Sequence, residues 1–210
     1  MAEGASIHWL FTTRARPIGI VRCQFPTLYM HTSSLRKTSS NPSSNHYISS
    51  DVNYIEGQIP KEYGSDAKEI QGGRDILRAL ETSGAKWGVV TSGTRALISG
   101  WLEVLGLTHP ENLVVAEDVP LGKPDPRCYL LGAKMIGLED SKSVLVLEDA
   151  PSGIKAGKAA GYKVLALATT HSLDKLRAAG ADWIVDDLRS LKVHSVVDGK
   201  VQVEISNALQ

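Results

Sequence analysis

Two adjacent carboxylates, Glu148 and Asp149, stand at the end of the apolar run 144–147 and precede a Pro-Ser-Gly turn. A short apolar run bounded by turn signals is typical of a buried parallel strand. Side chains at the carboxyl end of such a strand point into the crevice where open α/β sheets bind ligands. Two neighbouring acids there need a cation or hydrogen bonds, and Mg²⁺ is the simplest cation for oxygen ligands. The alternative is that Asp149 only caps the next helix.

Two further polar sites fall at equivalent places in the chain. Thr91 and Ser92 end another short apolar run, and a hydroxyl next to a helix N-terminus can bind an anion. Lys123 lies in a proline-rich loop and offers a point charge for phosphate. Taken singly, these residues could be a strand end and a solvated lysine. Because all three sites accompany strand ends, we predict that they converge at one sheet edge as a pocket for a phosphoryl group and Mg²⁺.

Strand-like and helix-like segments alternate along most of the chain. This order predicts right-handed βαβ units, and therefore an α/β fold with a parallel sheet and helices on both faces. Two alternating runs around Asp198-Gly199 predict a final hairpin. The expected strands are 87–90, 113–116, 143–147, 164–168 and 183–185, and the expected helices are 76–84, 94–106, 127–136, 152–160 and 173–179.

The overall composition limits the partners. The chain has 23 basic and 23 acidic side chains and a formal net charge of zero, so no overall basic field attracts nucleic acid or an anionic membrane. No apolar run approaches the roughly 20 residues of a membrane span. The two cysteines form no disulfide framework, which favours a reducing compartment. We expect a cytoplasmic monomer whose partner is a small phosphorylated metabolite.

The segment 1–50 differs from the remainder. Glu3 is its only acid, and the Ser/Asn-rich stretch 35–50 cannot bury enough apolar surface to order itself. Three interpretations remain: a disordered extension, a transit peptide that would make the protein mitochondrial, since the segment is rich in Arg and Ser, and aberrant sequence from a wrong gene model.

Three strings resemble motifs of the haloacid-dehalogenase-like (HAD) phosphatases, with a particular likeness to the fungal glycerol-1-phosphate and 2-deoxyglucose-6-phosphate phosphatases. They are TSGT at 91–94, GKPDP at 122–126 and LEDAPSGIKAGKAAG at 147–161. The string YIEGQIPKEYGSDAKEIQGGRDIL at 54–77 resembles the end of that family's helical cap. The resemblance implies an N-terminal extension at 1–50, a cap remnant and linker at 51–71, and a HAD-like Rossmannoid core at 72–210.

The resemblance also implies roles for the candidate residues. Thr91 and Ser92 would bind the phosphoryl oxygens, and Lys123 would hold the phosphate and act in catalysis. Asp149 would ligate Mg²⁺, with Glu148 beside it, reaching the ion through water. The implied activity is hydrolysis of a small polyol or sugar phosphate, of the glycerol phosphate or 2-deoxyglucose 6-phosphate class.

The chain departs from the family at its first motif, an Asp-x-Asp-x-Thr whose first Asp attacks phosphorus. None of the first 50 residues is an aspartate, and most of the cap is missing. We therefore expect an inactive phosphatase. The alternative is a non-catalytic remnant that binds phosphate and Mg²⁺, or the product of a mispredicted gene.

Loss of the motif-bearing strand would leave a gap in the centre of the sheet, with unpaired backbone groups on both sides. The chain must fill the gap, misassemble or bind a partner. The candidate filler is the segment Ile18–Phe25, lying parallel between the strands that end at Thr91 and Leu147 and placing Gln24 at the nucleophile position. An open gap would leave the amides of Val89 and Val146 poorly protected from hydrogen exchange.

Overall fold

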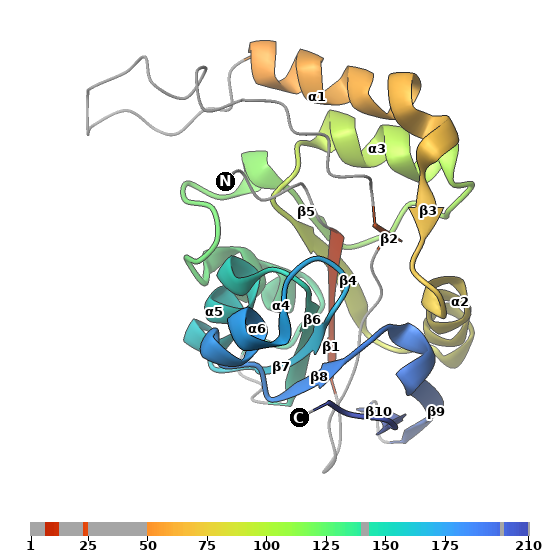
Figure 1. The fold of residues 1–210 in the computed structure, drawn as a ribbon, viewed down its shortest axis with the longest axis vertical. Helices are drawn as coiled ribbons and strands as arrows, with labels where there is room; N and C mark the ends of the chain where they lie inside the picture. The colour runs from red at the N-terminus through yellow and green to blue at the C-terminus, as the bar shows by residue number, and fades with distance from the viewer. Residues whose placement is uncertain (1–6, 13–22, 25–49, 140–142, 198–199, 210) are drawn as a thin grey trace.

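The computed structural model describes residues 7–12, 23–24, 50–139, 143–197 and 200–209. Its centre is a six-stranded sheet in the order β5-β4-β1-β6-β7-β8 (Figure 1). Strands β4 and β5 are parallel to each other, as are β6, β7 and β8. The bounds of these strands are β1 Ile7–Thr12, β4 Trp87–Thr91, β5 Leu113–Val114, β6 Val144–Glu148, β7 Lys163–Leu167 and β8 Trp183–Val185.

The helices alternate with the strands as the sequence predicts. In Figure 1, α4, α5 and α6 lie together on one side of the sheet, whereas α2 lies on the other with β9 and β10. The antiparallel pair β9–β10 confirms the predicted hairpin strands. The bounds are α1 Ser50–Tyr63, α2 Gly73–Ser83, α3 Arg95–Val104, α4 Arg127–Met135, α5 Pro151–Ala159, α6 Leu173–Ala178, β9 Leu191–Val197 and β10 Lys200–Ile205.

Strand β1 occupies the gap that the sequence predicts between β4 and β6. It is antiparallel to both neighbours, with Trp9 opposite Val89 and Leu10 opposite Val146. The central strand is therefore replaced, and both flanking strands are paired.

The prediction that Ile18–Phe25 fills this gap is wrong. The described part of that segment, β2 (Cys23–Gln24), pairs antiparallel with β3 (Lys68–Glu69) in a separate two-stranded sheet. Gln24 therefore does not take the nucleophile position, and residues 18–22 and 25 lie outside the described residues. The physical reason lies in composition: a central strand is paired on both sides and favours uncharged residues, and IHWLFT of β1 has none of the charge that Arg22 brings to IGIVRCQF.

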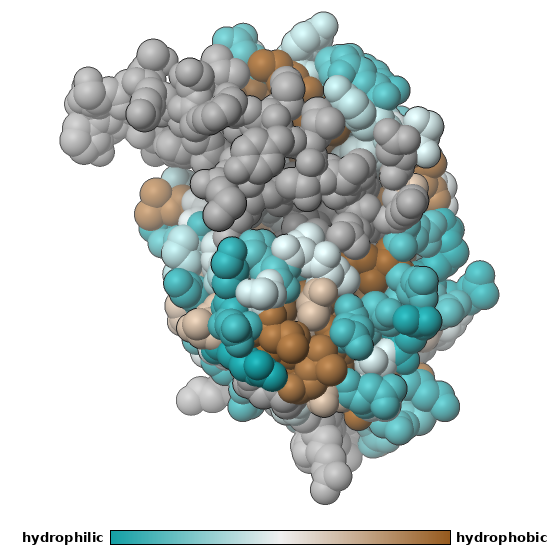
Figure 2. Space-filling model, in the orientation of Figure 1, coloured by the Kyte–Doolittle hydropathy of each residue, from teal (hydrophilic) through white to brown (hydrophobic). Residues whose placement is uncertain are grey.

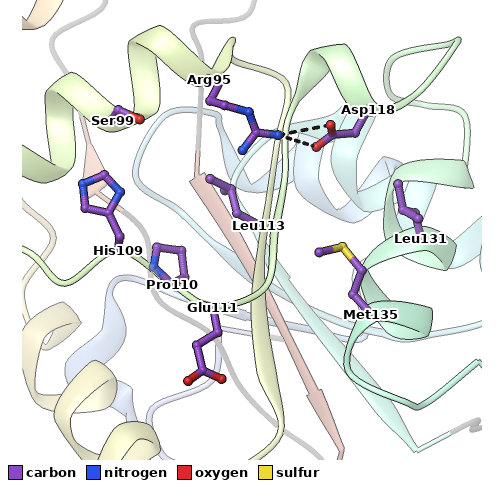
Figure 3. Close-up of a pocket in the computed structure, with 9 residues that line it drawn as sticks. All are labelled: Arg95, Ser99, His109, Pro110, Glu111, Leu113, Asp118, Leu131 and Met135. Carbon is purple, nitrogen blue, oxygen red and sulfur yellow. Dashed lines mark hydrogen bonds and ion pairs between the residues drawn. The ribbon is translucent and has the colours of Figure 1, made fainter.

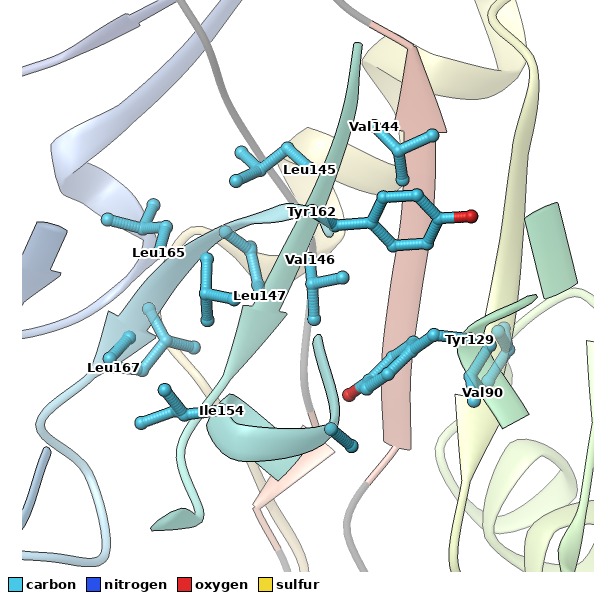
Figure 4. Packing of buried hydrophobic residues seen from close by; sticks show 14 of the residues in the cluster. Val90, Tyr129, Val144, Leu145, Val146, Leu147, Ile154, Tyr162, Leu165 and Leu167 are labelled. Carbon is cyan, nitrogen blue, oxygen red and sulfur yellow. The ribbon is translucent and has the colours of Figure 1, made fainter. Parts of the chain in front are cut away.

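The core is built from the apolar residues of the sheet and of the helices that cover it. Figure 4 shows buried side chains of β6 and β7 packed with Tyr129 and Tyr162. Helix α5 lies directly against the sheet, because a Cβ added at Gly157 would stand 2.9 Å from the Val164 side chain. The small residues of GIKAGKAAG thus bring this helix close to β6 and β7, next to the carboxylates that precede it.

The large exposed apolar side chains of the described residues come from different elements. On the face shown in Figure 2, hydrophilic residues cover most of the described surface and hydrophobic ones are confined to limited areas. Within the described part of the chain, no helix has the length and apolar character needed to cross a membrane. The exposed large apolar residues are Tyr54, Val104, Leu121, Leu130, Met135, Val197 and Leu209.

The direction of β1 can be tested by disulfide trapping. An antiparallel β1 places Phe11 opposite Trp87, so the pair Phe11→Cys and Trp87→Cys should form a disulfide under mild oxidation, since paired strand positions have Cβ atoms about 4.5–5.5 Å apart. Peptide mapping by mass spectrometry would detect it.

The control keeps Trp87→Cys and moves the partner to Ile7→Cys, at the opposite end of β1. This control should stay reduced. A disulfide in the control and none in the Phe11 pair would mean that the strand runs parallel to β4.

Candidate active site

Lys123 joins the ends of two strands that β1 separates. Its ammonium donates to the carboxylate of Glu148, with Nζ 2.9 Å from Oε1, and lies 3.5 Å from the carbonyl oxygen of Val90. The lysine side chain is only 4% exposed. Since Val90 precedes Thr91 and Glu148 precedes Asp149, one buried cation contacts the residues next to both predicted polar sites.

The strand register also places Thr91 and Asp149 at the same edge of the sheet. Leu10 pairs with Gly88 on one side and with Val146 on the other, so these two residues are level across the sheet. Three residues further along the parallel strands β4 and β6, Thr91 and Asp149 come level at the carboxyl edge. They are two strand spacings apart, about 10 Å. The structure therefore brings Thr91, Lys123 and Asp149 to one edge of the sheet.

Between these two strand ends stands the first residue of β1, Ile7, which pairs with Thr91. A parallel strand at this position would present its last residue to the site. The antiparallel β1 presents its first residue, and none of its six residues, IHWLFT, carries a carboxylate. The described strand therefore supplies no nucleophile of the aspartyl type.

The carboxylate of Glu148 is buried and accepts hydrogen bonds from both side chains and backbone. Oε1 accepts from Lys123 and from the hydroxyl of Tyr129, both at 2.9 Å, and Oε2 accepts from the backbone N–H groups of Asp149 and Ala150 at 2.8 and 2.9 Å. Burial and the neighbouring Glu148 carboxylate raise the pKa of Tyr129 well above its usual value, so the phenol stays neutral and donates. This geometry makes Glu148 the residue that positions Lys123, while its contact with a metal through water stays a prediction.

The approach of α5 leaves room for this carboxylate only because residue 153 is a glycine. A Cβ built on Gly153 would lie 1.5 Å from Glu148 Oε1. The Pro-Ser-Gly turn is therefore more than a helix start, since its glycine shapes the space that the Glu148 side chain fills.

The segment Thr91–Thr94 links the end of β4 to the start of α3. Thr91 is buried, and its hydroxyl oxygen accepts from the N–H of Gly93 at 3.0 Å. The hydroxyl of Thr94 caps α3 by accepting from Leu97 N–H. Ser92, between them, is exposed and available to a ligand.

The first N–H groups of α3 are taken by carboxylates of the protein itself. Glu56, on α1, accepts from Thr94 N–H at 2.9 Å, and Glu117 accepts from Arg95 N–H at 3.0 Å. An anion at this edge would therefore meet the turn at residues 91–93 and not the helix end. Glu56 and Glu117 were not predicted from the sequence as neighbours of this turn.

Asp149 is 1% exposed and lies under the loop that follows β7. The hydroxyl of Thr170 donates to its carboxylate, and the ring Nδ1 of His171 lies 3.1 Å from its carbonyl oxygen. Sequence reasoning missed Thr170 and His171, although one signal was present: like the other site residues, they are polar and follow a buried strand.

The side chains of the described residues can be compared with the ligands that a divalent cation requires. Among the described residues, no group of three His, Cys, Asp or Glu side chains is arranged to hold a metal. Mg²⁺ needs fewer protein ligands, because it keeps several waters and binds through one or two carboxylates together with phosphate oxygens. The buried carboxylate of Asp149 fits such a site, in which a bound phosphate and water complete the shell.

A separate hollow of about 630 Å³ lies at the β5 edge of the sheet (Figure 3). It contains none of the residues that the sequence singles out. An ion pair in its wall, Arg95 with Asp118 at 3.1 Å, ties the start of α3 to the segment after β5. The hollow is lined by Arg95, Ser99, His109, Pro110, Glu111, Leu113, Asp118, Leu131 and Met135.

The fit of Glu148 against α5 leads to a prediction. Gly153→Ala should lower the free energy of unfolding by about 2–4 kcal/mol, because the new methyl group either displaces the buried carboxylate from its donors or moves the helix. Urea denaturation measures this change.

Gly122→Ala is the matched control, since nothing lies within 4 Å of a Cβ built there. The control should change stability by less than about 0.5 kcal/mol. Equal stability of the Gly153 variant and the parent would show that Glu148 is not held as described.

Comparison with known proteins shows which family and which relatives the chain resembles. Residues 31–167 match the family described as haloacid dehalogenase-like hydrolase. The chain is 44% identical over 149 residues to glycerol-1-phosphate phosphohydrolase 1 of Saccharomyces cerevisiae, an alignment that covers 68% of this chain and 60% of that protein. It is 31% identical over 172 residues to 2-deoxyglucose-6-phosphate phosphatase 1 of the same yeast, covering 74% of this chain and 70% of that protein.

The fold also resembles solved structures. A hydrolase from Pseudomonas syringae superposes with a TM-score of 0.59 at 27% identity, over 63% of this chain and 62% of that one. The chain spans about three fifths of the length of the glycerol-1-phosphate phosphohydrolase that it matches.

Proposed function

Because this chain belongs to the haloacid dehalogenase-like hydrolase family, we propose that its pocket binds the phosphate of a small polyol or sugar phosphate together with Mg²⁺. The relatives named as phosphatases of glycerol 1-phosphate and of 2-deoxyglucose 6-phosphate support this substrate class. The protein is then a phosphomonoester hydrolase by descent. Its compartment, cytoplasm or mitochondrion, and its monomeric state stay predictions.

The observation that carries the proposal is the buried, oriented ammonium of Lys123. An ammonium has three N–H donors. One donates to Glu148 and a second is directed to the carbonyl of Val90, while the ring of Tyr129 lies 4.7 Å away and adds a favourable contact with the cation. The remaining donor is available to a phosphate oxygen at the sheet edge, between Thr91 and Asp149.

The other residues would complete phosphate recognition. The Thr91 hydroxyl and the Ser92 backbone N–H would donate to phosphoryl oxygens, and Asp149 would hold Mg²⁺. The ion, when bound, would neutralise part of the phosphate charge. Glu148 acts on the ligand only through Lys123, whose position it fixes.

Two functions are compatible with this pocket, and they differ in whether the protein has a residue that attacks phosphorus. In the first, the pocket binds its ligand without hydrolysis, because no aspartate stands on the strand between Thr91 and Asp149. In the second, another residue replaces the aspartate and the protein is an active phosphatase. The composition of β1 favours the first.

Phosphate binding tests the proposed pocket. Isothermal titration calorimetry in Mg²⁺ should detect binding of glycerol 1-phosphate and of inorganic phosphate to the full chain. Lys123→Met should weaken both by about 10- to 100-fold, the effect of losing one hydrogen bond to a charged group.

Because Lys123→Met leaves the Glu148 carboxylate buried without its cation, Thr91→Val serves as a second variant. It removes the hydroxyl at nearly constant volume and should also weaken phosphate binding. The control is Lys134→Met, at an exposed position of α4, which should bind like the parent. Identical affinities in all four proteins, or no binding to the parent, would contradict the proposal.

The absence of the aspartyl nucleophile leads to a prediction about turnover. The full chain should release no phosphate above background from glycerol 1-phosphate or 2-deoxyglucose 6-phosphate with Mg²⁺, because loss of a nucleophile in other enzymes costs on the order of 10⁶ in rate. A phosphate-release assay measures this. Robust turnover that Asp149→Ala abolishes would show instead that another residue attacks phosphorus.

A further inference from the structure

Glu56 connects α1 to the turn that we propose as the phosphate site. Its Oε2 accepts from the backbone N–H of Thr94 at 2.9 Å. Thr94 follows Ser92 by two residues, and two Cα steps of about 3.8 Å put the two within about 8 Å of each other. A whole small polyol or sugar phosphate, from its phosphorus to its far hydroxyl, extends over a comparable distance, so Glu56 is within reach of the organic part of an ester bound at this turn.

The position of Glu56 is fixed by close packing of α1 on α3, which lie side by side in Figure 1. A Cβ added at Gly57 would stand 3.1 Å from that of Ala96, and one added at Gly100 would stand 2.8 Å from Pro60 Cγ. Small residues on both helices thus permit a near approach of their backbones. Glu56 projects toward α3 as well, because its carboxylate accepts the hydrogen bond from the residue that caps this helix.

The charge around this end of α3 is negative. Glu56 and Glu117 both carry carboxylates bonded to its first N–H groups, while the nearby guanidinium of Arg95 is paired with Asp118. One oxygen of Glu56 accepts from Thr94. The other can accept from a ligand hydroxyl, whereas a ligand carboxylate or second phosphate at this place would be repelled.

We propose that Glu56 is a specificity-determining residue that selects phosphate esters of neutral polyols and sugars and rejects those that carry a second acidic group. The proposal rests on the proposed function of the Thr91–Lys123–Asp149 pocket. It gives helix α1 a defined role, because this helix holds one carboxylate at the edge of the phosphate site, where the carboxylate distinguishes ligands by charge.

The test compares Glu56→Gln with the parent, using three ligands in Mg²⁺: inorganic phosphate, glycerol 1-phosphate and phosphoglycolate. Glutamine keeps an oxygen for the Thr94 N–H and removes the charge. Calorimetry should show that the parent prefers glycerol 1-phosphate, and that in the variant the affinity for phosphoglycolate relative to glycerol 1-phosphate rises on the order of tenfold, as expected for removing a charge close to the second acidic group. Affinity for inorganic phosphate should change by about the same factor as that for glycerol 1-phosphate, because both ligands bring only the phosphate charge to the site.

The control is Glu62→Gln, which removes the same charge from an exposed position of α1. It should keep the preference of the parent, and thermal denaturation should show all three proteins folded. If the parent and the Glu56 variant bind phosphate but discriminate the two esters equally, the role of Glu56 is overturned while the pocket stands. If the parent binds none of the three ligands, the proposed function fails and the specificity role fails with it.

Discussion

The buried ion pair between Lys123 and Glu148 holds together the parts of this molecule that could do chemistry. Glu148 receives donors from the loop before α4, from Tyr129 within α4, and from the two residues that lead into α5. Removing one partner of such a pair leaves an uncompensated buried charge, which costs about 3–5 kcal/mol. The arrangement of strand ends, loop and two helices therefore depends on one carboxylate and the donors around it.

Helix α5 is fixed at both ends by carboxylates. At its start, Gly153 lies against Glu148. At its end, Lys158 donates to Asp182 at 2.6 Å, and the same carboxylate accepts from Lys163 at 2.7 Å and from Val164 N–H at 2.9 Å. Although burial alone would raise it, these donors lower the pKa of Asp182, so their stabilising contribution is present at neutral pH and is lost as the pH falls through that lowered pKa. Electrostatic contacts at opposite edges of the sheet thus hold the helix that follows Glu148 and Asp149.

Much of the fold follows from local signals. Short apolar runs that end in turn residues predict β4, β6, β7 and β8 to within one residue at every end, because burial in a parallel sheet imposes its own composition. The meeting of Thr91, Lys123 and Asp149 at one edge also follows, since parallel strands share their carboxyl ends. The positioning role of Glu148 could not be read in the same way, because its donor Tyr129 stands 19 residues away and only packing brings the hydroxyl to it.

The strand that fills the gap in the sheet could be predicted from the sequence only in part. The sequence predicts that a strand is needed, with Ile18–Phe25 as the candidate in a parallel direction, whereas the structure has IHWLFT at Ile7–Thr12 in an antiparallel direction. Composition separates the two candidates, since one contains an arginine and the other no charged residue. The composition of a strand does not determine its direction, because side chains alternate between the two faces of the sheet in the same way whether the strand is parallel or antiparallel to its neighbours.

The position of β1 has a consequence for the order in which the chain can fold. Strands β4 and β5 and strands β6, β7 and β8 form two groups whose members follow one another closely along the chain, joined by short helical connections. Strand β1 is the seam between them, and its partners lie roughly 80 to 130 residues away in sequence. Closing such long loops is entropically expensive and slow, so non-local pairings of this kind form after local ones. The two groups of strands are therefore expected to assemble first, with the seam closing last.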